Sequence, residues 1–106
     1  MRKVEVYKAG KLAGVLTEES LQSYLFAYDV SYLASAGSPI SVTLPKRQEP
    51  YVSESLFPFF MNMLPEGVNR STICRLNRID EKDYFGLLMF FSGKDIIGDV
   101  MVKSIV

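Results

Sequence analysis

The segment Phe59-Phe60-Met61-Asn62-Met63-Leu64-Pro65-Glu66-Gly67-Val68-Asn69-Arg70 lies where the hydrophobic period of the sequence changes. Before it, apolar and polar residues mostly alternate, as in strands; after it, apolar residues recur at helical spacing. Pro65 should end one helix, because proline disfavours helical geometry at the preceding Leu64. Proline also suits the first turn of the next helix. The segment therefore predicts a corner between two helices.

The sequence before this segment predicts strands. Residues 3–7 and 12–16 each carry strand-like apolar patterns, and Gly10 lies in a turn between them, which indicates an N-terminal hairpin. Residues 22–28 fit either a strand or one face of a helix. We favour a third strand, because its aromatic residues suit a pleated surface.

A short helix and a fourth strand are expected next. Asp29 can cap a turn of helix that runs to Ala34, since its carboxylate can accept from backbone N–H groups. Residues 40–44 have strand composition and are closed by Pro45. Residues 46–50 have the composition of a loop.

The segment itself predicts one helix and the start of another. Ser55 is expected to cap a helix that enters at Leu56 and stops near Met63, with Pro58 tolerated in its first turn. A second helix should start around Pro65 or Glu66. Its expected buried stripe consists of Val68, Thr72, Leu76 and Ile79.

A third helix and a closing strand complete the prediction. Asp80 and Asp83 resemble a helix start, and Tyr84, Leu87, Leu88 and Phe91 follow at helical spacing. Gly93 should cap this helix, residues 93–98 should form a turn, and residues 99–103 alternate as a strand. The sum is one α+β domain over residues 1–106. Its mainly antiparallel sheet comes from the N-terminal half and the last strand, packed with about three short helices from the second half.

Composition narrows the class of protein. The 106 residues include 12 basic and 12 acidic side chains, so no net charge attracts the chain to nucleic acid, and we expect no direct contact with it. No apolar run is long enough for a signal peptide or a membrane span, and Cys74 is the single cysteine. These features are typical of a cytoplasmic protein without disulfides and without membrane contact.

Residues that commonly act in catalysis or bind metals are largely absent from the sequence. The sequence has no histidine, so Ser-His-Asp triads, Cys-His pairs and histidine-ligated metal sites are excluded. Cys74 lacks a histidine base, and the acidic group Asp80, Glu81 and Asp83 matches no calcium-loop spacing. We therefore expect no enzyme activity, no catalytic residue, no metal and no cofactor.

Two interpretations of the opening segment stay open. Its apolar residues can form core, with Pro65 and Gly67 shaping the corner. Alternatively some of them face outward, because Phe57, Phe59, Phe60, Met61 and Met63 lie within seven positions and a short helix cannot bury them all. An exposed aromatic and methionine patch would indicate a protein-binding surface.

Several spaced motifs resemble one protein family. They are Phe59-Phe60-x-Asn62-x-Leu64-Pro65-Glu66-Gly67-x-x-Arg70, Asp83-x-Phe85-x-Leu87-Leu88, Gly93-x-Asp95-x-x-Gly98-Asp99-Val100, and upstream Tyr28-Asp29-x-x-Tyr32-Leu33 and Ile40-Ser41-Val42-x-Leu44-Pro45. Together they resemble the N-terminal domain of the HipA family of serine/threonine kinase toxins, over nearly the whole chain.

This resemblance implies a partner. In full-length HipA proteins the domain precedes a longer kinase region that carries the nucleotide-binding loop, the catalytic aspartate and the metal ligands. In split systems it is a separate HipS-type antitoxin beside a shortened HipA-like (HipT-like) kinase and a helix-turn-helix (HipB-like) repressor. The sequence starts at Met1 and stops at Val106, after the last expected strand, so it is either a fragment or a complete small protein. By similarity to the split systems we expect a stand-alone antitoxin.

The resemblance also suggests which residues meet the kinase. Phe60, Met61 and Leu64 would be apolar anchors, Glu66 and Arg70 a polar rim, and Gly67 a point of close backbone approach. The expected partner-binding set is Phe60, Met61, Asn62, Leu64, Pro65, Glu66, Gly67 and Arg70. The alternative is a structural or activating subunit that the kinase needs for folding or substrate choice.

Overall fold

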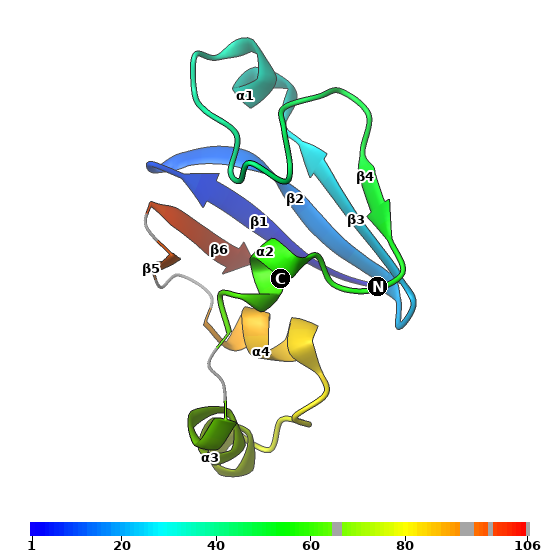
Figure 1. The fold of residues 1–106 in the computed structure, drawn as a ribbon, viewed down its shortest axis with the longest axis vertical. Helices are drawn as coiled ribbons and strands as arrows, with labels where there is room; N and C mark the ends of the chain where they lie inside the picture. The colour runs from blue at the N-terminus through cyan, green and yellow to red at the C-terminus, as the bar shows by residue number, and fades with distance from the viewer. Residues whose placement is uncertain (65–66, 92–94, 98, 106) are drawn as a thin grey trace.

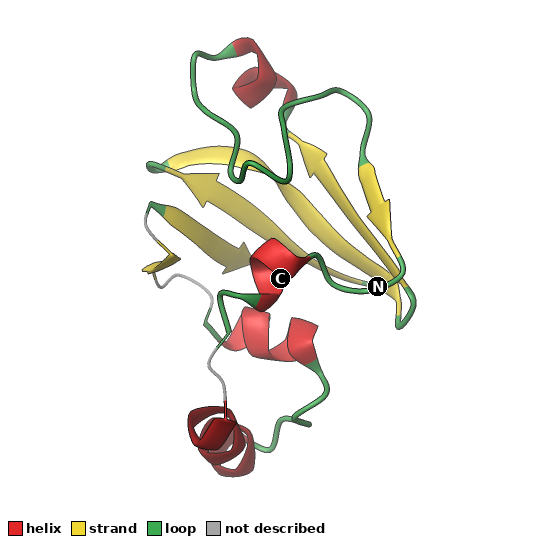
Figure 2. Ribbon diagram, viewed as in Figure 1, coloured by secondary structure: helices red, strands yellow, loops and turns green. Residues whose placement is uncertain are grey.

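An antiparallel sheet forms the body of the protein in the computed structural model, which describes residues 1–64, 67–91, 95–97 and 99–105 (Figures 1 and 2). Within this part of the chain the sheet has six strands in the order β4-β3-β2-β1-β6-β5. Their bounds are β1 (Arg2–Lys8), β2 (Lys11–Ser20), β3 (Ser23–Tyr28), β4 (Tyr51–Ser53), β5 (Asp95–Ile97) and β6 (Val100–Ser104). Every neighbouring pair of these strands is antiparallel, which confirms the predicted α+β class.

The hairpin expected at the N-terminus is present as β1 and β2. Ala9 and Gly10 form its turn with positive φ, which glycine adopts without strain. The third expected strand is also confirmed, as β3. Gly14 of β2 has to be small, because a Cβ there would lie 2.4 Å from the carbonyl oxygen of Ala27 on β3.

The described part of the chain contains four helices: α1 (Val30–Ala34), α2 (Pro58–Met61), α3 (Gly67–Asn77) and α4 (Tyr84–Phe90). The carboxylate of Asp29 caps α1 by accepting from the backbone N–H of Ser31 and of Tyr32, as predicted. Asp83 caps α4 by accepting from the N–H of Gly86 at 3.0 Å. The predicted cap at Asp29 is therefore confirmed, and of the predicted pair Asp80 and Asp83 it is Asp83 that caps the helix.

The core fills the space between one face of the sheet and the helices α2 and α4. In Figure 1, α2 lies in front of the sheet, with α4 beside it, while α1 and α3 lie at opposite ends of the long axis. The side chains with at most 1% exposure come from both layers, and include Val4, Val6, Leu16, Phe26, Val102, Phe60, Phe85, Leu87 and Leu88. None of the described helices is long and apolar enough to cross a membrane.

Residues 40–44, expected as a strand, form a tight turn instead. The N–H of Leu44 donates to the carbonyl of Ser41 at 3.1 Å, so the segment folds back on itself. The hydroxyl of Tyr28 holds both ends, because it accepts from the N–H of Ile40 at 3.1 Å and donates to the carbonyl of Leu44. The backbone groups of Ile40 and Leu44 thus form hydrogen bonds with a side chain instead of with a neighbouring strand.

Three further boundaries differ from the prediction. Strand β4 occupies residues 51–53, and α2 begins after Phe57 without a side-chain cap, so Ser55 is not the cap. Strand β5 lies within residues 93–98, which were expected to be only a turn, and the expected cap Gly93 lies outside the described residues. Pro58 stands in the first turn of α2, as predicted.

Candidate partner-binding surface

Helix α2 places its largest side chains in the core. Phe60 is 0% exposed and Leu64 is 5% exposed, and the ring of Phe60 lies 5.9 Å from that of Phe26 on β3. Phe57 and Met63 are buried as well. Phe60 and Leu64 therefore do not present anchors on the surface of this fold, because α2 directs Phe60 inward and Leu64, three residues after α2, is buried as well.

The outward part of α2 is smaller than expected. Phe59 and Met61 are half-buried, and Asn62, which follows the helix, is exposed. The ring of Phe59 packs edge-on against Phe60 with centroids 5.2 Å apart, so only part of it is open to a partner. Of the expected set, Met61 at the end of α2 and Asn62 directly after it offer surface.

The remaining expected residues lie at the start of α3. Pro65 and Glu66 fall outside the described residues. Gly67 has a φ of +61°, and no described atom comes within 4 Å of the Cβ that another residue would add, so its role here is conformational. The guanidinium of Arg70 lies 5.4 Å from the ring centroid of Tyr84, which ties α3 to the start of α4.

Helix α3 presents an apolar stripe to solvent. Val68, Thr72 and Leu76 follow one another at a spacing of four residues and form what we call the α3 stripe. Val68 is 81% exposed and Leu76 is 72% exposed, whereas Thr72 is half-buried. The sequence predicted that these residues and Ile79 form a buried stripe. That is wrong for Val68 and Leu76, whereas Ile79 lies beyond α3 and packs against the core.

The reason is that α3 touches the rest of the domain through its other side. Cys74 is its one buried residue among those described, and Ile73 packs against the core beside it. Burial raises the pKa of the Cys74 thiol. An amphipathic pattern cannot show which of two apolar faces meets the domain, so periodicity alone gave the wrong face.

The surface around the α3 stripe is basic. The helix contains Arg70 and Arg75 and no acidic residue, and Arg78 follows it. An open depression of about 600 Å³ lies along its first turns, lined by Gly67, Val68, Arg70, Ser71, Thr72, Arg75 and Glu81. A partner of this surface needs apolar groups opposite the stripe and acidic groups around them.

An ion-pair network joins the sheet to the start of α4. Arg2 donates from Nε to Glu18 at 2.7 Å, and its two terminal nitrogens donate to the two carboxylate oxygens of Asp83 at 3.1 and 2.7 Å. The hydroxyl of Tyr24 donates to the second oxygen of Glu18 at 3.2 Å. Arg2 lowers the pKa of Asp83, assisted by the N–H of Gly86. No local pattern indicated this network, because Arg2 and Asp83 are 81 positions apart.

Known proteins are similar to this chain in sequence and in fold. Residues 4–103 match the family described as the HipA N-terminal domain. An uncharacterized protein of Haemophilus influenzae is 32% identical over 104 residues, which cover 98% of this chain and 93% of that protein. A putative kinase, Y4mE of Sinorhizobium fredii, is 30% identical over 99 residues, or 92% of this chain, but only 23% of the kinase.

A solved structure agrees with these sequence matches. The structure described as the N-terminal domain of HipA toxin superposes with a TM-score of 0.75 and 29% identity, and the match covers 100% of this chain and 94% of that one. The topology and the sequence thus lead to the same family. This chain belongs to the family of HipA N-terminal domains.

Proposed function

We propose that this domain is a non-catalytic partner of a HipA-like (HipT-like) serine/threonine kinase, which it binds and neutralises as an antitoxin. Two relatives support this proposal. The putative kinase of Sinorhizobium fredii contains the domain as 23% of its length, so the same fold occurs beside other sequence in one chain. The Haemophilus influenzae relative consists almost entirely of the domain, so the fold also occurs with little else attached.

The α3 stripe is the observation that carries the proposal. Two large aliphatic side chains that are more than two-thirds exposed, on a helix with one buried residue among those described, form a surface that water solvates poorly. Burying a Val or Leu side chain contributes about 1.5–3 kcal/mol. Covering both would therefore strengthen a complex considerably, while leaving them exposed adds nothing to the domain's own stability.

Neutralisation by this domain requires no chemistry from its own side chains. A domain bound to one lobe of a kinase restricts lobe closure or nucleotide access, and either effect lowers activity. The arginines around the α3 stripe set the orientation of the complex, because charged rims fix register and speed association. The half-buried Met61 and the exposed Asn62, which follows α2, extend the contact.

Co-expression with a HipA-like kinase from the same genome tests the proposal. We expect the wild-type domain to relieve growth arrest caused by the kinase, and Val68→Lys with Leu76→Lys to abolish relief, because two charges replace the apolar contact. Arrest that deepens when the wild-type domain is present would instead identify an activating subunit.

Matched variants separate loss of binding from loss of fold. Val30 is 81% exposed and Val42 is 94% exposed, and both lie outside α3. Val30→Lys with Val42→Lys should protect cells as well as the wild type does. All four substituted positions are exposed, so the melting temperatures of both double variants should stay close to that of the wild type.

A further inference from the structure

A second concave surface opens on the other side of the segment between α3 and α4. It has a volume of about 690 Å³ and lies between the β2–β3 turn, the segment after β4 and the segment before α4. We call it the hairpin cleft. Its lining consists of Arg2, Glu18, Leu21, Tyr24, Glu54, Ser55, Leu56, Asp80, Lys82, Asp83 and Tyr84.

The hairpin cleft has apolar and aromatic side chains at its base. Tyr24 and Leu56 are buried at its base with 8% and 5% exposure, and Tyr84 is half-buried. Leu21, at the tip of the hairpin, is 82% exposed at the rim. Exposed leucine beside an aromatic wall suits the aliphatic part of an inserted side chain.

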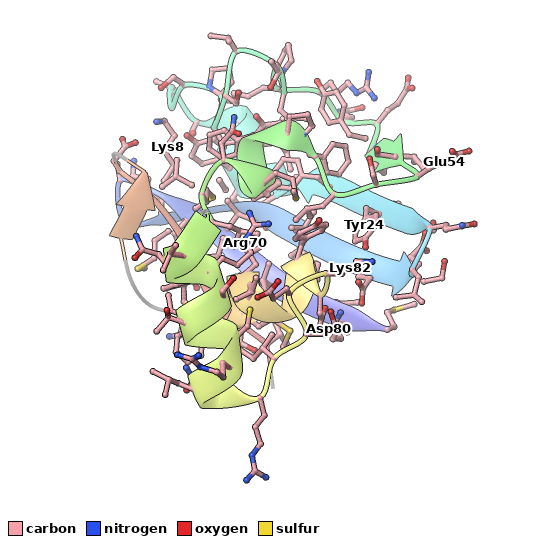
Figure 3. The ribbon with its side chains drawn as sticks, turned by 60° about the horizontal axis from the view of Figure 1, so that its bottom comes forward. Lys8, Tyr24, Glu54, Arg70, Asp80 and Lys82 are labelled. Atoms are coloured by element: carbon pink, nitrogen blue, oxygen red, sulfur yellow. The ribbon has the colours of Figure 1, made fainter. Side chains whose placement is uncertain are left out.

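The rim of the hairpin cleft carries excess negative charge. Four carboxylates and two cations line it, but Arg2 is already shared by Glu18 and Asp83. The outer carboxylates, Glu54 and Asp80, are exposed and come from separate segments, and the exposed Lys82 also lines the cleft. Figure 3 shows Glu54, Tyr24, Lys82 and Asp80 in succession across this part of the molecule.

We propose that the hairpin cleft receives a lysine or arginine side chain of the partner kinase, which reaches the carboxylates of Glu54 and Asp80 while its aliphatic stem packs on Tyr24. This inference rests on the proposed function, and charge complementarity selects the occupant. The position agrees with the α3 stripe. Glu81 lines the depression along α3, whereas its neighbours Asp80 and Lys82 line the cleft, so one partner can cover both.

Charge reversal in the purified domain tests the cleft. Glu54→Lys with Asp80→Lys should raise the Kd for the purified kinase by about tenfold or more, because an attractive contact becomes repulsive. The salt dependence of the Kd should also weaken, since fewer attractive charges meet across the interface. Isothermal titration calorimetry at two salt concentrations measures both effects.

A matched control keeps the net charge change the same. Glu5→Lys with Glu49→Lys alters two acidic residues that do not line the cleft, and should leave the Kd within about twofold of the wild-type value. A cleft variant that binds as tightly as this control overturns the inference. The proposed function would then still stand, provided that the wild type binds the kinase and the Val68 and Leu76 variant does not.

A small probe tests the cleft without the kinase. N-acetyl-leucyl-arginine amide, titrated into the labelled domain, should shift the backbone amide NMR signals of Leu21, Tyr24, Ser55 and Lys82, and should not shift them in the charge-reversal variant. A titration that moves none of these signals overturns the inference even if the wild-type domain fails to bind the kinase.

Discussion

Aromatic contacts join the helices to the sheet at the scale of single residues. The ring of Phe60 lies 5.9 Å from Phe26, 6.4 Å from Phe57 and 5.2 Å from Phe59. Because α2 is only one turn long, these contacts rather than its own backbone hydrogen bonds hold it in place. The segment that resembles a family signature is thus a structural part of the fold as well as a surface.

Truncation of Phe60 should destabilise the domain severely. Phe60→Ala removes a fully buried ring and leaves a cavity, and we expect the free energy of unfolding to fall by about 3–5 kcal/mol. Urea denaturation followed by circular dichroism measures the change. Phe59→Ala is the matched control and should cost less, because Phe59 is half-buried; equal losses would contradict the assignment of Phe60 to the core.

At the scale of elements, local signals predicted local structure well. The cap at Asp29, the start signal at Asp80 and Asp83 and the alternation in β1 each act within a few residues, and the structure has a helix or strand at each. Residues 40–44 were misassigned because the side chain that shapes them, Tyr28, lies 12 positions before Ile40. No periodicity within the segment contains that information.

The Tyr28 hydroxyl should be essential for this turn. Tyr28→Phe leaves the buried N–H of Ile40 and the carbonyl of Leu44 without that partner, and we expect a loss of about 1–3 kcal/mol in unfolding free energy. Tyr51→Phe is a suitable control, because its hydroxyl donates to the carbonyl of Pro45 in an exposed setting. A Tyr28→Phe protein as stable as the control would show that the hydroxyl does not hold the turn.

The sequence indicated that some apolar side chains of the candidate surface face outward, but not which of them do. The sequence indicated that the aromatic and methionine segment exceeds what one short helix can bury, and Met61 and Asn62 do offer surface. It did not show that α3 turns Val68 and Leu76 outward, since that depends on Cys74 and Ile73 meeting the core. Which face of an amphipathic helix is buried is decided by tertiary packing.

At the scale of the whole molecule, the Arg2 network connects the first strand to the start of the last described helix. Arg2 on the first strand pairs with Asp83 at the cap of α4, with side-chain exposures of 33% and 35%. Such a partly exposed pair contributes modestly to stability, but it fixes the position of α4 against β1. Both the α3 stripe and the hairpin cleft depend on that position, because they flank the segment that leads into α4.

The Asp83 carboxylate should make the unfolding free energy of the domain depend on pH in the acid range. Its folded-state pKa lies below the ordinary value of 3.8, so the pair stabilises the fold above that value and this contribution is lost as pH falls through the folded-state pKa. Asp83→Asn retains a side chain that can cap α4 but loses the charge. We expect it to cost about 1 kcal/mol or less at neutral pH and nothing in strong acid.

Urea denaturation of the wild type and of Asp83→Asn, at acid and at neutral pH, measures the difference between their unfolding free energies. Asp99→Asn is a matched control: Lys8 also lowers the pKa of Asp99, but the Asp99 side chain is more exposed, at 53%. The loss of unfolding free energy caused by Asp99→Asn should have the same sign and be smaller. If Asp83→Asn lowers the unfolding free energy by the same amount in strong acid as at neutral pH, the ion pair is not the cause of the loss.

The single cysteine makes the attachment of α3 measurable. Cys74 is 3% exposed and lies on the side of α3 that meets the domain, and its thiol has a raised pKa, so an alkylating reagent should reach it only when the helix lifts away. The rate of alkylation then reports how often α3 detaches. A bound kinase that covers the α3 stripe should slow this reaction, although it never touches the sulfur atom.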